Sequence, residues 1–204
     1  RGGAAEYLAV PAANLAAKPD GLEFPAGAAP LLVSLTAWRM LIHRARLRAG
    51  ETVLVVGSGG GVNSMAIQIA KLAGARVYAV AGNRLKAEKA RELGADVALD
   101  RSKVDWSREI YRLTDKRGVD VVVDNVGQAT INQSMLAVAR GGRVVIVGNT
   151  SGPTAQIDMR YIFGKHISLI GSTMGSHQDF RDIVKLVCTG RLKPVIDRIL
   201  PLRE

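Results

Sequence analysis

The stretch TVLVVGSGGGVNSMAIQIAK, residues 52–71, decides the fold class of this chain. Residues 52–57 predict a buried strand, and the apolar spacing over residues 61–73 predicts an amphipathic helix. Four glycines occupy the five positions 57–61 between them. Glycine lets the backbone approach a phosphate closely, and a helix N-terminus offers free N–H groups and a positive dipole end. The stretch therefore predicts a phosphate-binding turn, with a purely structural turn as the alternative.

Strand and helix patterns alternate along the rest of the chain. Short β-branched runs, several of them apolar on both faces, stand at 52–57, 76–82, 96–99, 119–127, 142–148 and 166–171. Helical patterns lie between or after them at 61–73, 84–93, 105–115, 128–139 and 177–189. This alternation is typical of parallel strands covered by helices on both sides. We predict an α/β fold with a doubly wound parallel sheet, the Rossmann fold.

Composition and charge narrow the function classes. The 204 residues are 48% hydrophobic, which suits a globular protein, and the formal net charge is +10. The cations are dispersed among acids and the few aromatic residues are scattered, so nucleic-acid binding is an unfavoured alternative. The single cysteine, Cys188, allows no internal disulfide. We see no signal peptide and no run of transmembrane length, and expect a cytoplasmic protein with no membrane partner.

Asn63 stands where the dinucleotide fingerprint closes with a glycine. Asparagine tolerates a left-handed backbone better than other non-glycine residues, and its amide can form local hydrogen bonds. We expect Asn63 to leave a working site, and the alternative is a neutral substitution with slightly looser packing.

The end of the second predicted strand bears on which dinucleotide is bound. In NAD-binding proteins an Asp or Glu about twenty residues beyond the glycines bonds the ribose 2′-hydroxyl. Here residues 78–86 contain no acid; Asn83, Arg84 and Lys86 stand there, and Arg101 follows the third predicted strand. Arginine binds a phosphate with paired donors, so we favour NADP(H) over NAD(H). The alternative is that Arg84 and Lys86 are ordinary solvated charges.

In several stretches the chain resembles the medium-chain dehydrogenase/reductase superfamily, in its quinone oxidoreductase and zinc-type alcohol dehydrogenase branches. These stretches run in family order: LTAWRMLIHRARLRAGETVLVVGSGGGVNSMAIQIAKLAGARVYAVAG, KARELGADVALD, GVDVVVDNVG, GGRVVIVGNTSG, ISLIGSTMGS and GRLKPVIDRILPL. The resemblance implies a two-domain enzyme that transfers a hydride between NAD(P)H and a small carbonyl or activated alkene. It implies that residues 31–204 are the NAD(P)-binding Rossmann domain. Residues 1–30, rich in Ala and Pro, would then be a remnant of the catalytic domain with a linker.

The resemblance also implies a set of cofactor-binding positions. Thr36 would lie near the nicotinamide, the turn would hold the pyrophosphate, and the cations after the second strand would meet the ribose phosphate. The full set is Thr36, Gly59, Gly60, Gly61, Val62, Asn63, Asn83, Arg84, Lys86, Arg101, Asn125, Val126, Val147, Gly148, Asn149, Ser172, Thr173 and Met174.

The departures from the family pattern concern catalysis. Leu32 stands where zinc alcohol dehydrogenases keep a catalytic cysteine, and leucine cannot bind zinc. We therefore expect no zinc in this chain and name no catalytic residue; His43, His166 and His177 share no metal-ligand spacing. The resemblance implies a homodimer formed through the last sheet strand. A non-catalytic NADPH-binding module or sensor remains an alternative to the reductase.

Overall fold

The computed structural model describes residue 3 and residues 5–202, and in it the strands form one parallel sheet. The strand order is β3-β2-β1-β4-β5-β6, so strands are added on one side of β1 up to β3 and on its other side from β4 onward. This is the doubly wound arrangement, so the predicted fold class is confirmed. The strands are β1 (Thr52–Val56), β2 (Arg76–Ala81), β3 (Val97–Asp100), β4 (Val119–Asp124), β5 (Val138–Ile146) and β6 (Ser168–Gly171).

Each face of the sheet carries its own hydrophobic core because successive side chains of a strand point to opposite faces. Val53 and Val55 of β1 belong to one core, and Leu54 and Val56 belong to the other. All four valine and leucine side chains are buried. The central strands can therefore be apolar at every position, as the sequence showed.

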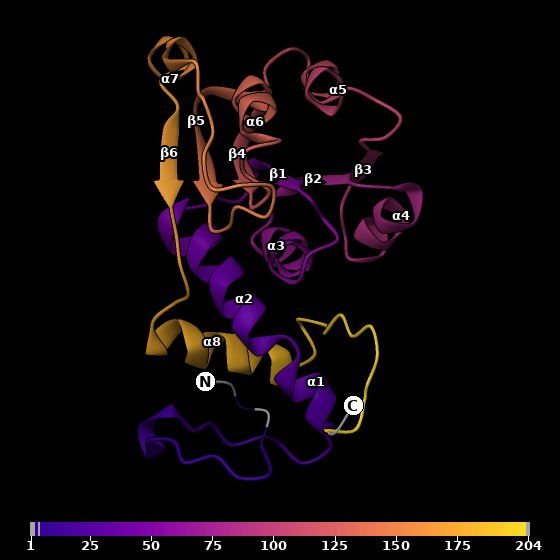
Figure 1. The fold of residues 1–204 in the computed structure, drawn as a ribbon, viewed down its shortest axis with the longest axis vertical. Helices are drawn as coiled ribbons and strands as arrows, with labels where there is room; N and C mark the ends of the chain where they lie inside the picture. Colours follow the sequence, from indigo (N-terminus) through magenta and orange to yellow (C-terminus); the bar gives the residue numbers. More distant parts are fainter. Residues whose placement is uncertain (1–2, 4, 203–204) are drawn as a thin grey trace.

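Helices cover both faces of the sheet (Figure 1). The first core contains residues from α2 (Leu31–Trp38), α3 (Gly61–Leu72), α4 (Arg84–Glu92) and α8 (His177–Cys188). The second contains residues from α5 (Trp106–Leu113) and α6 (Ile131–Ala137), and partly buried Tyr161 and Ile162 of α7 (Met159–Lys165) pack against it. Helix α7 was not predicted, because residues 149–165 lack a long apolar period.

The N-terminal part of the chain divides at about residue 22. Residues 5–21, with the short helix η1 (Ala12–Asn14), are exposed and lie beyond α8, away from the sheet (Figure 1). The Ala/Pro-rich sequence and the helical pattern after it led us to expect that residues 1–50 lie against the sheet as an appendage, and for residues 5–21 this expectation is wrong. From α1 (Phe24–Ala28) through α2 the chain turns onto the first core.

The helical stretch from Phe24 to Arg44 consists of α1, a turn at residues 29–30, α2 and η2 (Arg39–Arg44), and η2 has π-helical hydrogen bonds. It is long and apolar enough by composition to cross a membrane, so our expectation of no such run is wrong. Its apolar face contributes buried Ala37, Met40 and Leu41 to the first core, which accounts for the composition.

Two boundaries differ from prediction at the second half of the sheet. Helix α6 ends at Ala137 and β5 begins at Val138, because Val138 pairs with Val119 before a shift in register brings Arg143 opposite Val121. His166 does not begin a strand: it takes a left-handed conformation, with φ 55°, at the end of α7.

Candidate functional site

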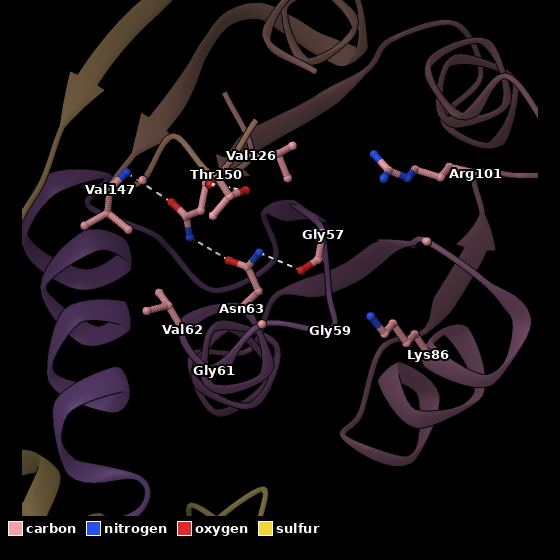
Figure 2. A pocket seen from close by; sticks show the side chains of 14 residues that line it. Gly57, Gly59, Gly61, Val62, Asn63, Lys86, Arg101, Val126, Val147 and Thr150 are labelled. Carbon is pink, nitrogen blue, oxygen red and sulfur yellow. Dashed lines mark hydrogen bonds between the residues drawn. The ribbon is translucent and has the colours of Figure 1, made fainter. Parts of the chain in front are cut away.

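A cavity of about 530 Å³ opens at the carboxyl ends of the central strands. Open α/β sheets bind ligands where the strand order reverses, and here that point lies between β1 and β4. The lining residues come from the turn after β1 and from the segments that follow β2, β3, β4 and β5 (Figure 2). They are Gly57, Gly59, Gly60, Gly61, Val62, Asn63, Gly82, Lys86, Arg101, Asn125, Val126, Val147, Gly148 and Thr150.

The glycines of the turn after β1 are required by space and by backbone conformation. Gly57 has φ 81°, and a Cβ there would lie 2.8 Å from Cγ2 of Val126. A Cβ on Gly61 would lie 2.9 Å from Cγ1 of Val33, so this glycine lets α3 pack closely on α2. The turn thus needs glycine both to bend and to bring the helix against its neighbours.

Helix α3 begins at the floor of the cavity without a side-chain cap. Its N-cap residue is Gly60, no acidic residue stands in its first turn, and Gly61 and Val62 line the cavity. The first N–H groups of a helix have no acceptor within the helix, and the dipole is positive at this end. The turn therefore presents donors and positive potential to an anionic group.

Asn63, which is 4% exposed, is anchored by hydrogen bonds on both sides of its amide. Its Nδ2 donates to the carbonyls of Val56 and Gly57, both at 2.8 Å, and its Oδ1 accepts from Nδ2 of Asn125 at 2.6 Å. Asn125 in turn accepts from the backbone N–H of Val147 at 3.0 Å. Figure 2 shows the bonds that run from Val147 to Gly57 by way of Asn63 across the cavity floor.

These contacts show that one of the two properties we considered for Asn63, tolerance of a left-handed backbone, is not used. Asn63 lies within helix α3 and is not among the residues with positive φ, so tolerance of a left-handed backbone is not its role. The local hydrogen bonding that we expected of its amide is confirmed, and further bonds connect Asn63 through Asn125, which follows β4, to Val147, which follows β5.

Buried Asp124, at the end of β4, fixes the turn that carries Asn125. Its Oδ1 accepts from the N–H groups of Val126 and Gly127 and from the Thr130 hydroxyl, while Oδ2 accepts from Ser134. A carboxylate with this many donors is satisfied although it is buried. Asp124 is therefore a structural anchor behind the cavity and does not line it.

Among the described residues that line the cavity there are two cations and no carboxylate. Lys86 and Arg101 reach into the cavity from the side of β2 and β3 (Figure 2). Asn83 caps helix α4, because its Oδ1 accepts from the backbone N–H of Lys86 at 2.9 Å. Asn83 thus acts on the site by fixing the first turn of α4, from which the Lys86 side chain extends over Gly59.

Arg84 lies outside the cavity, unlike the two cations beside it. Its Nε donates to Glu88 Oε1 at 2.8 Å across one turn of α4, and its side chain is 89% exposed. The bond with Glu88 raises the pKa of Arg84. Of the four polar residues predicted for the ribose-phosphate corner, the structure brings Lys86 and Arg101 to the cavity.

Five further predicted residues also lie outside the cavity lining. Thr36 is 7% exposed, and its hydroxyl donates to the Leu32 carbonyl at 3.0 Å within α2. Ser172 and Thr173 line a separate hollow with Arg39 and Arg44 beyond the end of β6. The remaining residues, Asn149 and Met174, do not line either hollow.

Gly57, Gly82 and Thr150 line the cavity but were absent from our set of site residues. Gly57 and Gly82 directly follow the ends of β1 and β2, and a glycine at a strand end was the signal available. Thr150 had no such signal. It enters the site because its backbone N–H approaches the Asn125 carbonyl at 3.4 Å.

None of the histidines is among the described residues that line this cavity. His43 Nε2 is 2.7 Å from Oδ1 of Asp179, which Ser176 and Arg39 also contact. Burial opposes ionisation of Asp179, but the Ser176 hydrogen bonds and the charges of His43 and Arg39 leave its pKa lowered. Among the described residues no group of three His, Cys, Asp or Glu could hold a metal ion.

The fold and the site together define a Rossmann-type α/β domain whose switch-point cavity has a glycine-rich floor. Comparison with known proteins gives the family. Residues 61–189, more than half of the chain, match the zinc-binding dehydrogenase family. The chain therefore belongs to this family, and the matched region is the cofactor-binding part of medium-chain dehydrogenases and reductases.

Individual relatives agree with this assignment. The quinone oxidoreductase of Pongo abelii is 32% identical over 209 residues, covering all of this chain and 63% of the relative. A crystal structure of an NAD-dependent alcohol dehydrogenase superposes with a TM-score of 0.94 at 43% identity, over 98% of this chain and 59% of that one. The 2-octenoyl-CoA carboxylase reductase CinF, in complex with NADP and 2-octenoyl-CoA, has a TM-score of 0.76 at 30% identity.

The chain spans only part of the length of these proteins. The match with CinF covers 82% of this chain and 42% of the CinF chain. In none of the three comparisons does the match cover more than 63% of the relative. The relatives are oxidoreductases by name, and one is bound to NADP, which supports binding of a nicotinamide cofactor.

Proposed function

We propose that this chain is the NADP(H)-binding domain of an oxidoreductase that transfers a hydride between nicotinamide and a small carbonyl or activated alkene. The observation that carries the proposal is the charge of the cavity. Lys86 and Arg101 line it, no carboxylate does, and the glycine turn with the α3 N-terminus forms its floor. A 2′-phosphate would meet cations there without repulsion, whereas NAD sites use an acid at this place.

The lining fits a dinucleotide in its local chemistry. Gly57 and Gly61 keep side chains out of the floor, and the unpaired N–H groups of the first turn of α3 suit a pyrophosphate. By resemblance, the segment at Val147 and Gly148 would lie at the nicotinamide end. A bound cofactor would supply the hydride chemistry, and the chain would bind and orient it.

The named relatives differ in cofactor, so the preference for NADP(H) rests on the cavity. One relative is named an NAD-dependent alcohol dehydrogenase, and another is bound to NADP. The difference can be tested directly by titrating the chain with NADPH and following nicotinamide fluorescence. Lys86→Ala and Arg101→Ala are each expected to weaken NADPH binding about tenfold or more, as loss of a hydrogen bond to a charged group does.

The matched control is Arg84→Ala, which removes a neighbouring cation outside the cavity. We expect Arg84→Ala to leave the dissociation constants of NADPH and NADH unchanged. If Arg84→Ala selectively weakens NADPH while the other two variants do not, the assignment of the phosphate-binding residues is wrong. If all three variants weaken NADH as much as NADPH, recognition of a 2′-phosphate is wrong.

Two parts of the proposal concern the larger protein. A homodimer through β6 would use the outer edge of that strand, which is the last in the sheet. The substrate class rests on the family resemblance and on the names of the relatives. Reduction of quinones, enals or aldehydes by the longer protein would separate an enzyme from a non-catalytic NADPH-binding module.

A further inference from the structure

The orientation of the Asn63 amide is fixed by its surroundings. Its Nδ2 lies 2.8 Å from two backbone carbonyls, those of Val56 and Gly57. Carbonyl oxygens only accept hydrogen bonds, so the NH₂ group must face them and both of its protons are used. The Oδ1 atom therefore points the other way, toward Asn125.

The same reasoning fixes Asn125. Its Nδ2 must donate to Oδ1 of Asn63, at 2.6 Å, and its Oδ1 faces the N–H of Val147, at 3.0 Å. A backbone N–H only donates, which agrees with this orientation. The bonds therefore run in one direction, from Val147 through Asn125 and Asn63 to the end of β1, and aligned bonds of this kind strengthen one another.

The amide chain joins the two halves of the cavity. Asn63 belongs to α3 beside the glycine turn, Asn125 follows β4, and Val147 follows β5 (Figure 2). All three residues line the cavity, and the hydrogen bonds between them cross the point between β1 and β4 where the strand order reverses. A glycine at position 63 would make none of these side-chain bonds, so nothing on α3 would hold Asn125 in place.

We infer that Asn63 is a positioning residue that couples the phosphate-binding turn to the segment at Val147, and that it does so through Asn125. The inference rests on the proposed function, in which the turn binds the phosphates and the Val147 segment lies at the nicotinamide end. Replacing Asn125 removes both side-chain bonds of this bridge, and replacing Asn63 removes its α3 end together with the bonds to Val56 and Gly57. The glycine turn keeps the bonds from the N–H groups of Gly57 and Ser58 to the Val80 carbonyl, and Lys86 keeps its place on α4. Binding of the nicotinamide half should suffer, and binding of the phosphate half should not.

The test compares a whole ligand with half of it. NADPH and adenosine 2′,5′-bisphosphate, which lacks the nicotinamide, are titrated by calorimetry into the full chain. The chain is used unsubstituted, as Asn63→Gly, as Asn125→Ala and as the double variant. Asn132→Ala is the control, because the Asn132 side chain bonds the carbonyl of exposed Gln156, and neither residue lines the cavity. Thermal melting of each variant shows that it is folded.

For Asn63→Gly and for Asn125→Ala we expect the dissociation constant of NADPH to rise about tenfold. That of the bisphosphate should change less than about twofold. The double variant should resemble either single variant, because both break the same bridge. The emission maximum of bound NADPH should shift toward that of free NADPH in all three. If Asn63→Gly does not fold, Asn125→Ala gives the same comparison from the other strand.

Equal weakening of both ligands would mean that Asn63 only supports the turn, and it would overturn the inference. Unchanged NADPH binding, or losses that add in the double variant, would also overturn it. If the unsubstituted chain binds neither ligand, the proposed function itself fails. The two failures are therefore distinguishable.

Discussion

The side chain of Lys86 lies directly over Gly59: a Cβ placed on this glycine would be 2.8 Å from Cδ of the lysine. Lys86 extends from the first turn of α4, and Gly59 belongs to the turn after β1. The contact connects the phosphate-binding turn with one of the two cations in the cavity. Because Gly59 has no side chain, the Lys86 side chain can lie over it, and the cavity floor stays free of side-chain atoms at this position.

We predict that Gly59→Ala reduces NADPH affinity about tenfold while the chain stays folded. The added methyl group would displace the flexible Lys86 side chain, and Gly59 is not among the positive-φ glycines. Its melting temperature should change little, and NADH should lose less affinity than NADPH. Fluorescence titration and thermal melting measure both effects.

Gly57→Ala provides the contrast for this experiment. Its φ of 81° and its approach to Val126 make alanine costly there. A left-handed backbone alone costs about 1–2 kcal/mol for a non-glycine residue. The melting temperature should therefore fall clearly. Equal losses of stability in the two variants would contradict the distinction between a binding glycine and a structural one.

Asp179 should make stability depend on acidity. Its side chain is 2% exposed and contacts Arg39 and His43 of η2 and Ser176 at the start of α8. Burial raises the pKa of Asp179, but the Ser176 hydrogen bonds and the neighbouring His43 and Arg39 side chains outweigh it, so the folded-state pKa lies below the ordinary 3.8. The stabilisation is present in full above the unfolded-state value. It is lost as pH falls through the folded-state pKa.

Asp179→Asn should therefore flatten the fall in melting temperature below about pH 4. The variant should also be less stable than the unsubstituted chain at neutral pH, by about 1–3 kcal/mol, because contacts to a buried charge are lost. Other carboxyls with lowered pKa, such as Asp120, remain and keep part of the pH dependence. An unchanged slope would show that the Asp179 charge does not contribute to the pH dependence of stability.

The outer edge of β6 carries the prediction about assembly. Leu169 of this strand is 37% exposed, and Phe163 of the preceding helix α7 is 69% exposed. If two copies pair through this edge, Leu169→Lys brings like charges together and should shift dimer to monomer. Light scattering after gel filtration measures the change. Leu85→Lys on α4, which is 64% exposed, is the control and should leave the mass unchanged.

The central fold could be predicted because its information is local. Residue type and spacing were enough to predict strand β1, the glycine turn after it and helix α3. The boundaries of the later elements were harder to predict. The start of β5 depends on a register shift against β4, and the left-handed conformation of His166 depends on how α7 ends. Both are set by tertiary contacts, which the local sequence does not show.

The cavity residues also divide into positions that the local sequence predicts and positions that tertiary contacts decide. Backbone-based positions such as Gly59 and Val62 follow from the motif, and they line the cavity. Side chains do not follow so simply: Arg84 and Lys86 are two residues apart, yet Arg84 pairs with Glu88 outside the cavity. Helix geometry directs side chains two residues apart to different faces, so the charge count alone could not choose between them.

Binding of NADPH and NADH to the same preparation, measured side by side by nicotinamide fluorescence, tests the central claim most directly. The cations Lys86 and Arg101, without any lining carboxylate, lead us to expect NADPH to bind at least about tenfold tighter than NADH. Raising the salt concentration should reduce this difference, because the preference is electrostatic. Equal affinities, or tighter binding of NADH, would contradict the assignment of the cavity to a 2′-phosphorylated dinucleotide.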